Sequence, residues 1–148
     1  MGMYTEIYVN VTLQAEMPEQ VRQLLTEGWK YEGGLPDHPF FKCERWGHIL
    51  SPGLGGGSYY FNRNNGYCFT GPDDLSGTYS LLIIKDLKNY DSEIEKFFEW
   101  ISLYVEGAHH EHTHVGHYRF EESEAPTVVM MSPRDNIYTS TIVMAEPS

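Results

Sequence analysis

The chain has 148 residues, a formal net charge of −11, and hydrophobic residues at 41% of its positions. This length and apolar content suit one globular domain with a single core, and they exclude a disordered chain. The 10 lysines and arginines are spread along the sequence without a basic patch, which argues against direct binding of DNA or RNA.

The first third of the sequence predicts a strand, a helix and a second strand. Residues 5–13 alternate apolar and polar side chains, a pattern typical of a half-buried strand. Pro18 and Gly28 flank a short apolar stripe at helical spacing, which predicts a helix between them. Residues 40–50, FFKCERWGHIL, are then expected to form a strand that ends at the glycine-rich sequence SPGLGGG.

The middle of the chain predicts a hairpin, a buried strand and a long helix. The hairpin is expected over residues 58–71 around the turn NNG, and residues 78–87 are apolar enough for a buried strand. Residues 91–107, DSEIEKFFEWISLYVEG, have apolar side chains at helical spacing. We expect Asp91 to cap this helix and Gly107 to end it.

The last third predicts three further strands, at residues 112–120, 126–132 and 136–144. We therefore expect residues 1–148 to form a single α+β domain, with a mostly antiparallel sheet and two helices packed on one face. Residues 132–148 are expected to add a C-terminal strand to this domain.

The cysteines and the lack of a long apolar run predict the compartment. Cys43 and Cys68 form neither a CxxC pair nor a disulfide framework, so we expect reduced thiols. The N-terminus lacks the pattern of a signal peptide, and no apolar run approaches the roughly 20 residues that span a bilayer. These features predict a soluble cytosolic protein with no membrane partner.

The segment His109–His117 holds five of the seven histidines. On a strand, His110, His112 and His114 would share one face, where neutral imidazoles can bind Zn²⁺. A metal-dependent hydrolase would then use Glu111 or a distant acid as its base. The alternative is an exposed segment after a helix C-terminus, where the helix dipole tolerates charged imidazole. Both interpretations stay open, and apart from this zinc the sequence predicts no cofactor.

Basic and aromatic side chains concentrate in one other region, around HPFFKCERWGHIL and SYYF. Guanidinium, ammonium and aromatic groups together can hold a planar anionic ligand through charge and stacking. The alternative is that Phe40, Trp46 and Phe61 belong to the core, that Arg45 pairs with one of the many acids, and that Arg119 pairs with Glu121. The candidate ligand-binding residues are Lys42, Arg45, Trp46, Tyr59, Tyr60 and Arg119.

Five segments resemble a family of small uncharacterised proteins found in bacteriophages, prophages and some bacteria. They are MYTEIYVNVTL, LPDHPFFKCERW, SYYF, LKNYDSEIEKFFEWI and HYRFEESEAPTVV, and they span Met3 to about Met130. The stretch GAHHEHTH and the tail after Met131 depart from the family's pattern. The resemblance carries no established activity, but it implies an accessory role during infection, in the cytosol of a host cell.

The sequence contains no GxSxG elbow and no other motif that places a nucleophile beside a base. Together with the resemblance, this favours a non-enzymatic binding protein that counters a host antiviral defence system. It would sequester a small anionic, nucleotide-type immune signal or block a defence protein. Two alternatives stay open: the metal-dependent hydrolase, and a domain whose acidic face meets a basic partner. Exposed sheet edges also predict a homo-oligomer.

Overall fold

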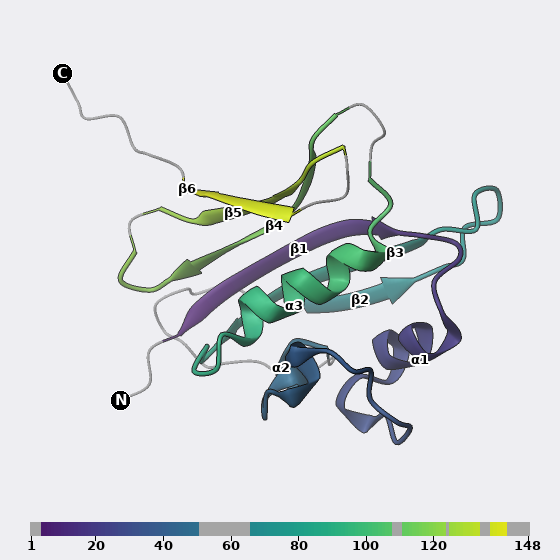
Figure 1. The fold of residues 1–148 in the computed structure, drawn as a ribbon, viewed down its shortest axis with the longest axis horizontal. Helices are drawn as coiled ribbons and strands as arrows, with labels where there is room; N and C mark the ends of the chain where they lie inside the picture. Colours follow the sequence, from purple (N-terminus) through teal and green to yellow (C-terminus); the bar gives the residue numbers. More distant parts are fainter. Residues whose placement is uncertain (1–3, 51–65, 108–110, 124, 134–136, 142–148) are drawn as a thin grey trace.

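The computed structural model describes residues 4–50, 66–107, 111–123, 125–133 and 137–141. In these ranges the chain forms a six-stranded antiparallel sheet with the strand order β2-β3-β1-β4-β5-β6. The helices lie on one side of this sheet (Figure 1). The predicted α+β class is confirmed.

The six strands occupy segments that the alternation of side chains predicts. They are β1 (Thr5–Leu13), β2 (Gly66–Thr70), β3 (Tyr79–Leu87), β4 (Thr113–Phe120), β5 (Thr127–Met131) and β6 (Ile137–Thr141). β2 is the second arm of the predicted hairpin, whose first arm lies outside the described residues, as does most of the predicted segment 132–148 apart from β6. In β1, Ile7 and Val9 are fully buried, whereas Asn10 and Thr12 are exposed, so one face of the sheet carries the core.

The helices are short and several continue as 3-10 turns. They are α1 (Glu19–Glu27) with η1 (Gly28–Lys30), η2 (Pro39–Lys42), α2 (Trp46–Ile49), and α3 (Glu93–Ile101) with η3 (Ser102–Tyr104). Pro18 precedes α1, and Gly28 follows it with a φ of 62°, a left-handed conformation that glycine adopts without strain. Both α1 boundaries agree with the sequence prediction.

The helix α3 ends earlier than expected. The α-helix stops at Ile101, and the 3-10 turn stops at Tyr104, three residues before the predicted end at Gly107. Val105 forms an isolated antiparallel bridge with Leu13, and Gln14 N donates to the Tyr104 carbonyl at 2.8 Å. These bonds draw the chain into an extended conformation at the end of β1, so tertiary pairing overrides the glycine signal.

The predicted strand over residues 40–50 is wrong. This segment forms η2 and α2 instead. Pro39 occupies the first position of η2, and the ring nitrogen Nδ1 of His38 accepts a hydrogen bond from Phe40 N at 3.1 Å. Phe40 and Phe41 are both buried, which two successive residues of a one-sided strand cannot achieve, since their side chains would point to opposite faces.

The core fills the space between the helices and the face of the sheet that they cover, which we call the helix face. Trp100 of α3 lies at its centre, stacked on Phe40 with ring centroids 5.7 Å apart and edge-on to Phe41 at 4.8 Å. Phe97 packs edge-on against Phe40 at 5.5 Å. We call the opposite face of the sheet the outer face.

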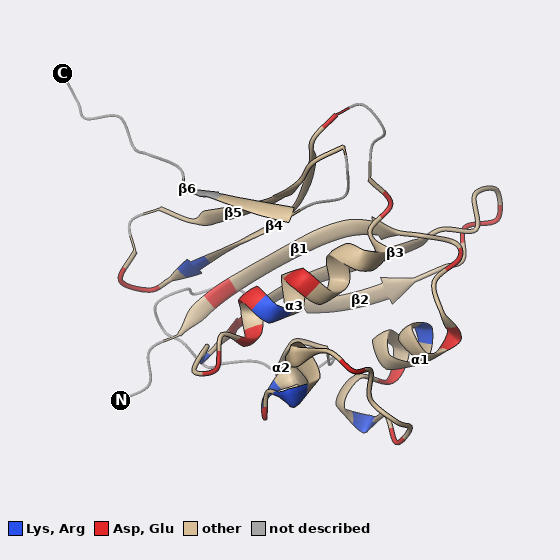
Figure 2. Ribbon diagram, in the orientation of Figure 1, with Lys and Arg blue, Asp and Glu red and all other residues tan. Residues whose placement is uncertain are grey.

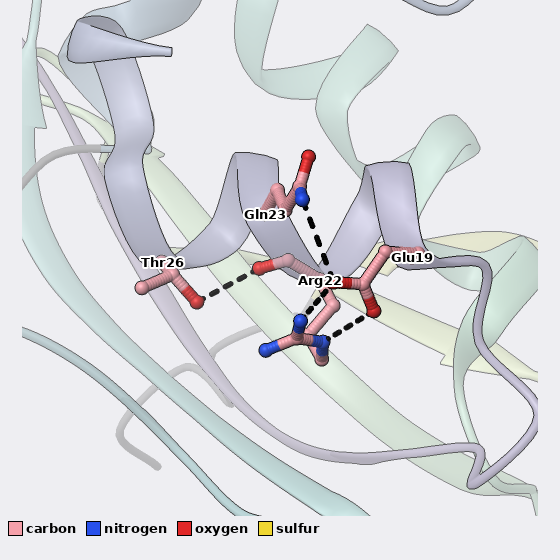
Figure 3. A network of polar contacts seen from close by, with 4 residues as sticks. All are labelled: Glu19, Arg22, Gln23 and Thr26. Carbon is pink, nitrogen blue, oxygen red and sulfur yellow. Dashed lines mark hydrogen bonds and ion pairs between the residues drawn. The ribbon is translucent and has the colours of Figure 1, made fainter.

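The solvent side of α1 carries a local polar network (Figure 3). Glu19 accepts hydrogen bonds from Arg22 Nε at 2.8 Å and from Gln23 at 3.4 Å. Thr26 Oγ1 donates to the Arg22 carbonyl at 2.8 Å. The bond to Arg22 lowers the pKa of the Glu19 carboxyl. Arg22 is therefore engaged within its own helix.

Within the described part of the chain, no helix has the length and apolar character needed to cross a lipid bilayer.

Candidate functional site

A cavity of about 530 Å³ opens on the helix face, at the end of the sheet where β1 begins and β4 ends. Its volume lies within the range of small-molecule sites. The walls come from β1, the loop between β3 and α3, the first turn of α3, β4, and the connection to β5. The residues that matter for its chemistry are Asn89, Tyr90, Glu95, Tyr118, Arg119 and Phe120.

The side chain of Asn89 fixes one wall of the cavity. Its carbonyl Oδ1 accepts from the backbone N–H of Ile94 at 3.0 Å, and so caps α3. Its amide Nδ2 lies 2.9 and 3.1 Å from the two carboxylate oxygens of Glu95. The predicted cap Asp91 is wrong, because Ser92 is the residue that precedes the helix, and the backbone N–H of Asp91 donates to the Glu93 carboxylate at 3.1 Å. Glu95 is thus held in place where it borders the cavity.

Tyr118 forms the facing wall. Burial raises the pKa of its hydroxyl, and the nearby negative charge of Glu95 raises that pKa further, although a hydrogen bond with Thr127 opposes the shift. The hydroxyl therefore stays protonated and can donate a hydrogen bond. Its ring packs against Phe98 of α3, with centroids 6.0 Å apart, which orients Tyr118 toward the helix face.

Aromatic rings and an arginine lie at the mouth of the cavity. Tyr90 is 63% exposed, and the guanidinium carbon of Arg45 lies 4.9 Å from the centre of its ring. Phe120, directly opposite Thr5 in the sheet, is 36% exposed. Arg119 of β4 also borders the cavity, but the alternation of the strand places its side chain on the other face of the sheet, with Glu6. Of the predicted ligand-binding residues, Arg45 is therefore the one that contacts an aromatic ring of this site.

The other predicted ligand-binding residues lie elsewhere or are not described. Lys42 is largely exposed and its ammonium lies 4.0 Å from Asp37. Trp46 is half-buried and packs edge-on against Phe41, with centroids 5.3 Å apart, at the border of the core. Tyr59 and Tyr60 lie outside the described residues.

A second hollow of about 250 Å³ continues along α3 from the cavity. It shares Glu95 and Tyr118 with the cavity, and it adds Glu99 from α3 and Ile137 from β6. The site is therefore the wider end of a cleft between α3 and the strands β4–β6. Its carboxylates all come from α3.

The histidines lie on another part of the molecule. A β-bulge between His114 and Gly116 changes the alternation, so His114 and His117 approach each other with ring centroids 6.3 Å apart. His112 Nδ1 lies 2.6 Å from the Tyr138 hydroxyl. In the ranges that the structure describes, no three His, Cys, Asp or Glu side chains form a group that could hold a metal. His110 lies outside these ranges, so the predicted zinc triad stays a prediction.

Two further ionisable groups are buried away from the cavity. Lys85 is 2% exposed, and its ammonium donates to the His48 carbonyl at 2.9 Å and lies 5.4 Å from the centre of the Tyr67 ring. Burial lowers the pKa of Lys85 to about 8. Burial also raises the pKa of the Cys43 thiol, which keeps it protonated and a poor nucleophile.

Comparison with known proteins finds no relative for this chain: no family model, no curated protein and no solved structure matches it. The resemblance to phage and prophage proteins therefore stays a prediction. A conclusion on function has to rest on the chemistry of the cavity.

Proposed function

We propose that this chain is a non-enzymatic binding protein whose cavity holds a small planar ligand of nucleotide type. The observation that carries the proposal is the position of Glu95. Its carboxylate is fixed by Asn89 at the wall of a cavity of about 530 Å³ that also has aromatic rings at its border, one of them in contact with Arg45.

The carboxylate favours a ring that donates hydrogen bonds. A fixed carboxylate accepts two parallel N–H groups well, and guanine presents such a pair on one edge. Adenine offers only one N–H on the corresponding edge, beside a ring nitrogen that accepts, so one carboxylate oxygen would face an acceptor, at a cost of about 1–3 kcal/mol. We therefore expect guanine derivatives to bind better than adenine derivatives.

The aromatic rings and Arg45 suit the stacking face of the base and the phosphate of a nucleotide. The exposed side chains of Tyr90 and Phe120 offer surfaces on which a base can stack. Arg45, beside Tyr90, offers a guanidinium group for a phosphate. Because the chain has a net charge of −11, a phosphate gains only where it lies next to this arginine.

The lining of the cavity favours binding over catalysis. Among the described residues that line it there is no histidine, cysteine or lysine that could serve as a nucleophile or as its partner base. In line with the resemblance to phage proteins, we propose that binding sequesters a nucleotide-type immune signal of the host.

A second candidate uses the same carboxylate. A guanidinium group fits a carboxylate bidentately, so an arginine of a host defence protein could enter the cavity instead of a base. The net charge of −11 favours such a basic partner. In this case the chain would block a defence protein.

Calorimetric titrations with guanosine 5′-monophosphate, adenosine 5′-monophosphate and N-acetyl-arginine amide separate these candidates. We expect the guanine nucleotide to bind most tightly. Glu95→Gln should weaken its binding by about tenfold or more, since a hydrogen bond to a charged group contributes about 1.5–3 kcal/mol. Glu106→Gln, outside the cavity, is the control. Tighter binding of the arginine amide would favour the second candidate, and no binding of any probe would refute both.

A further inference from the structure

The outer face of the sheet carries a second feature, independent of the cavity. Six of its side chains form a neutral patch that we call the outer patch: Tyr8, Leu82, Ile84, Val128, Met130 and Tyr138. Leu82 is 36% exposed and Tyr138 is 40% exposed, and the other four are half-buried. They come from β1, β3, β5 and β6, and His114 and His117 of β4 lie among them.

The strand register makes this patch continuous. Tyr8 pairs with Ile84 on one side and with His117 on the other, and His117 pairs with Val128. The rings of Tyr8 and His117 are stacked, with centroids 5.0 Å apart. A neighbouring row includes Leu82 opposite Asn10 and Met130 opposite Tyr138.

Charged residues are kept away from this patch. They make up 21% of the chain, yet the described strands contain only Glu6, Lys85, Asp86 and Arg119. Glu6 lies opposite both Asp86 and Arg119 at one end of the sheet, and Lys85 is buried. Figure 2 shows the result: acidic and basic residues lie mainly on the helices and loops, and most of the strand surface is neutral.

We propose that a second copy of this chain packs on the outer patch, so that two sheets lie face to face in a symmetric dimer. A two-fold axis places the same surface against itself, so each charge near the axis would meet a like charge. For a chain with a net charge of −11, the outer patch is a surface where two copies approach without that repulsion.

The composition of the patch also fits an interface. Aromatic residues and methionine are enriched in interface cores, and aspartate, glutamate and lysine are depleted there. Sheets pack face to face at about 10 Å with their side chains interdigitating. The cavity lies on the helix face, so the dimer leaves both cavities open, and the proposal stands or falls independently of the ligand.

Sedimentation velocity of the full chain tests this proposal. We expect the wild type to sediment as a dimer, with twice the chain mass of 17.1 kDa. Leu82→Glu should sediment as a monomer, because it buries a carboxylate within the neutral patch of each copy. Leu75→Glu makes the same change at a leucine that is 99% exposed outside the sheet, and it should remain a dimer.

A second variant distinguishes loss of the dimer from loss of the fold. Asn10→Glu adds a carboxylate at an exposed polar position opposite Leu82 without removing an apolar side chain, and it should also be monomeric with a nearly unchanged melting temperature. A wild type that is monomeric at all accessible concentrations would overturn the proposal. So would a dimer that persists in both the Leu82→Glu and the Asn10→Glu variants.

Discussion

The two faces of the sheet place their charged side chains differently. On the helix face, ionisable groups lie along the core and the cavity: Lys85 is 2% exposed, Glu93 is fully buried, and Glu95 is held by Asn89 at the wall of the cavity. On the outer face, Tyr8, Leu82 and their neighbours form a neutral patch, and the charged strand residues lie together at one end, where Glu6 and Asp86 are buried as well.

The difference shows how one sheet can provide two kinds of surface. A carboxylate that is fixed at a cavity wall gives a ligand site its specificity, because a ligand without donors displaces water there and does not replace its hydrogen bonds. A neutral, partly apolar face lacks such selectivity for small molecules, but it can pack against an identical face. The strand alternation separates these surfaces by a single layer of backbone.

The largest effect is expected at Gly116 of β4, whose backbone packs against Phe98 of α3. A Cβ atom there would lie 2.2 Å from the Tyr8 carbonyl oxygen and 2.9 Å from the Phe98 ring. Gly116→Ala should therefore lower the free energy of unfolding by about 3 kcal/mol through overpacking. Urea denaturation measures this loss. Gly66→Ala, where a Cβ meets nothing within 4 Å, should change it little, and equal effects in both variants would contradict the packing described.

The next largest effect concerns the pH dependence of stability that the buried Lys85 causes. The folded-state pKa of Lys85, about 8, lies below its ordinary value of 10.5, so between these pH values the unfolded chain binds more protons than the folded chain. The Lys85 contribution should therefore make the protein more stable as the pH rises, by about 2 kcal/mol from pH 8 to pH 10.

Urea denaturation of the wild type and of Lys85→Met at both pH values isolates this contribution. Between pH 8 and pH 10, the difference in unfolding free energy between wild type and Lys85→Met should change by about 2 kcal/mol, because the methionine variant lacks the titrating group. Lys88→Met, at a half-buried lysine just after β3, should retain the wild-type rise. A rise of the same size in Lys85→Met would show that another group is responsible.

A smaller effect is expected at the wall of the cavity. Asn89→Ala removes the acceptor for Ile94 N and the donor to Glu95, and should lower the unfolding free energy by about 1 kcal/mol, a typical value for a lost helix cap. It should also weaken binding of the guanine nucleotide, because Glu95 is no longer held. Asp91→Ala is the matched control in thermal melts, since that side chain does not cap α3. A greater loss in the control would contradict this assignment.

The sequence predicts the strands of this fold well because their alternation is local. Ile7, Val9 and Val11 alternate with polar residues, and burial follows the same period. The segment of residues 40–50 fails because a short aromatic run does not distinguish a strand from a tight helical turn. The useful signal was Pro39 after His38, a proline at the first position of a turn with a polar side chain before it.

The cavity is harder to predict because its walls are distant in sequence. Arg45 and Arg119 could be identified as cations near aromatic residues, but Asn89, Tyr90 and Glu95 look like an ordinary loop and an exposed helix surface. Only the antiparallel pairing of β1 with β4 brings Tyr118 and Arg119 next to the start of α3. An asparagine shortly before the helix was the one local signal for the cap.

The most direct test of the binding cavity is an NMR titration of the ¹⁵N-labelled chain with guanosine 5′-monophosphate. We expect saturable shifts at the backbone amides of Asn89, Glu95 and Tyr118 on the helix face, with Leu82 and Met130 on the outer face unaffected. Glu95→Gln should move the midpoint of these shifts to about tenfold higher ligand concentration or beyond. Shifts confined to the outer face, or none at any residue, would contradict the assignment of this cavity as a nucleotide-type binding site.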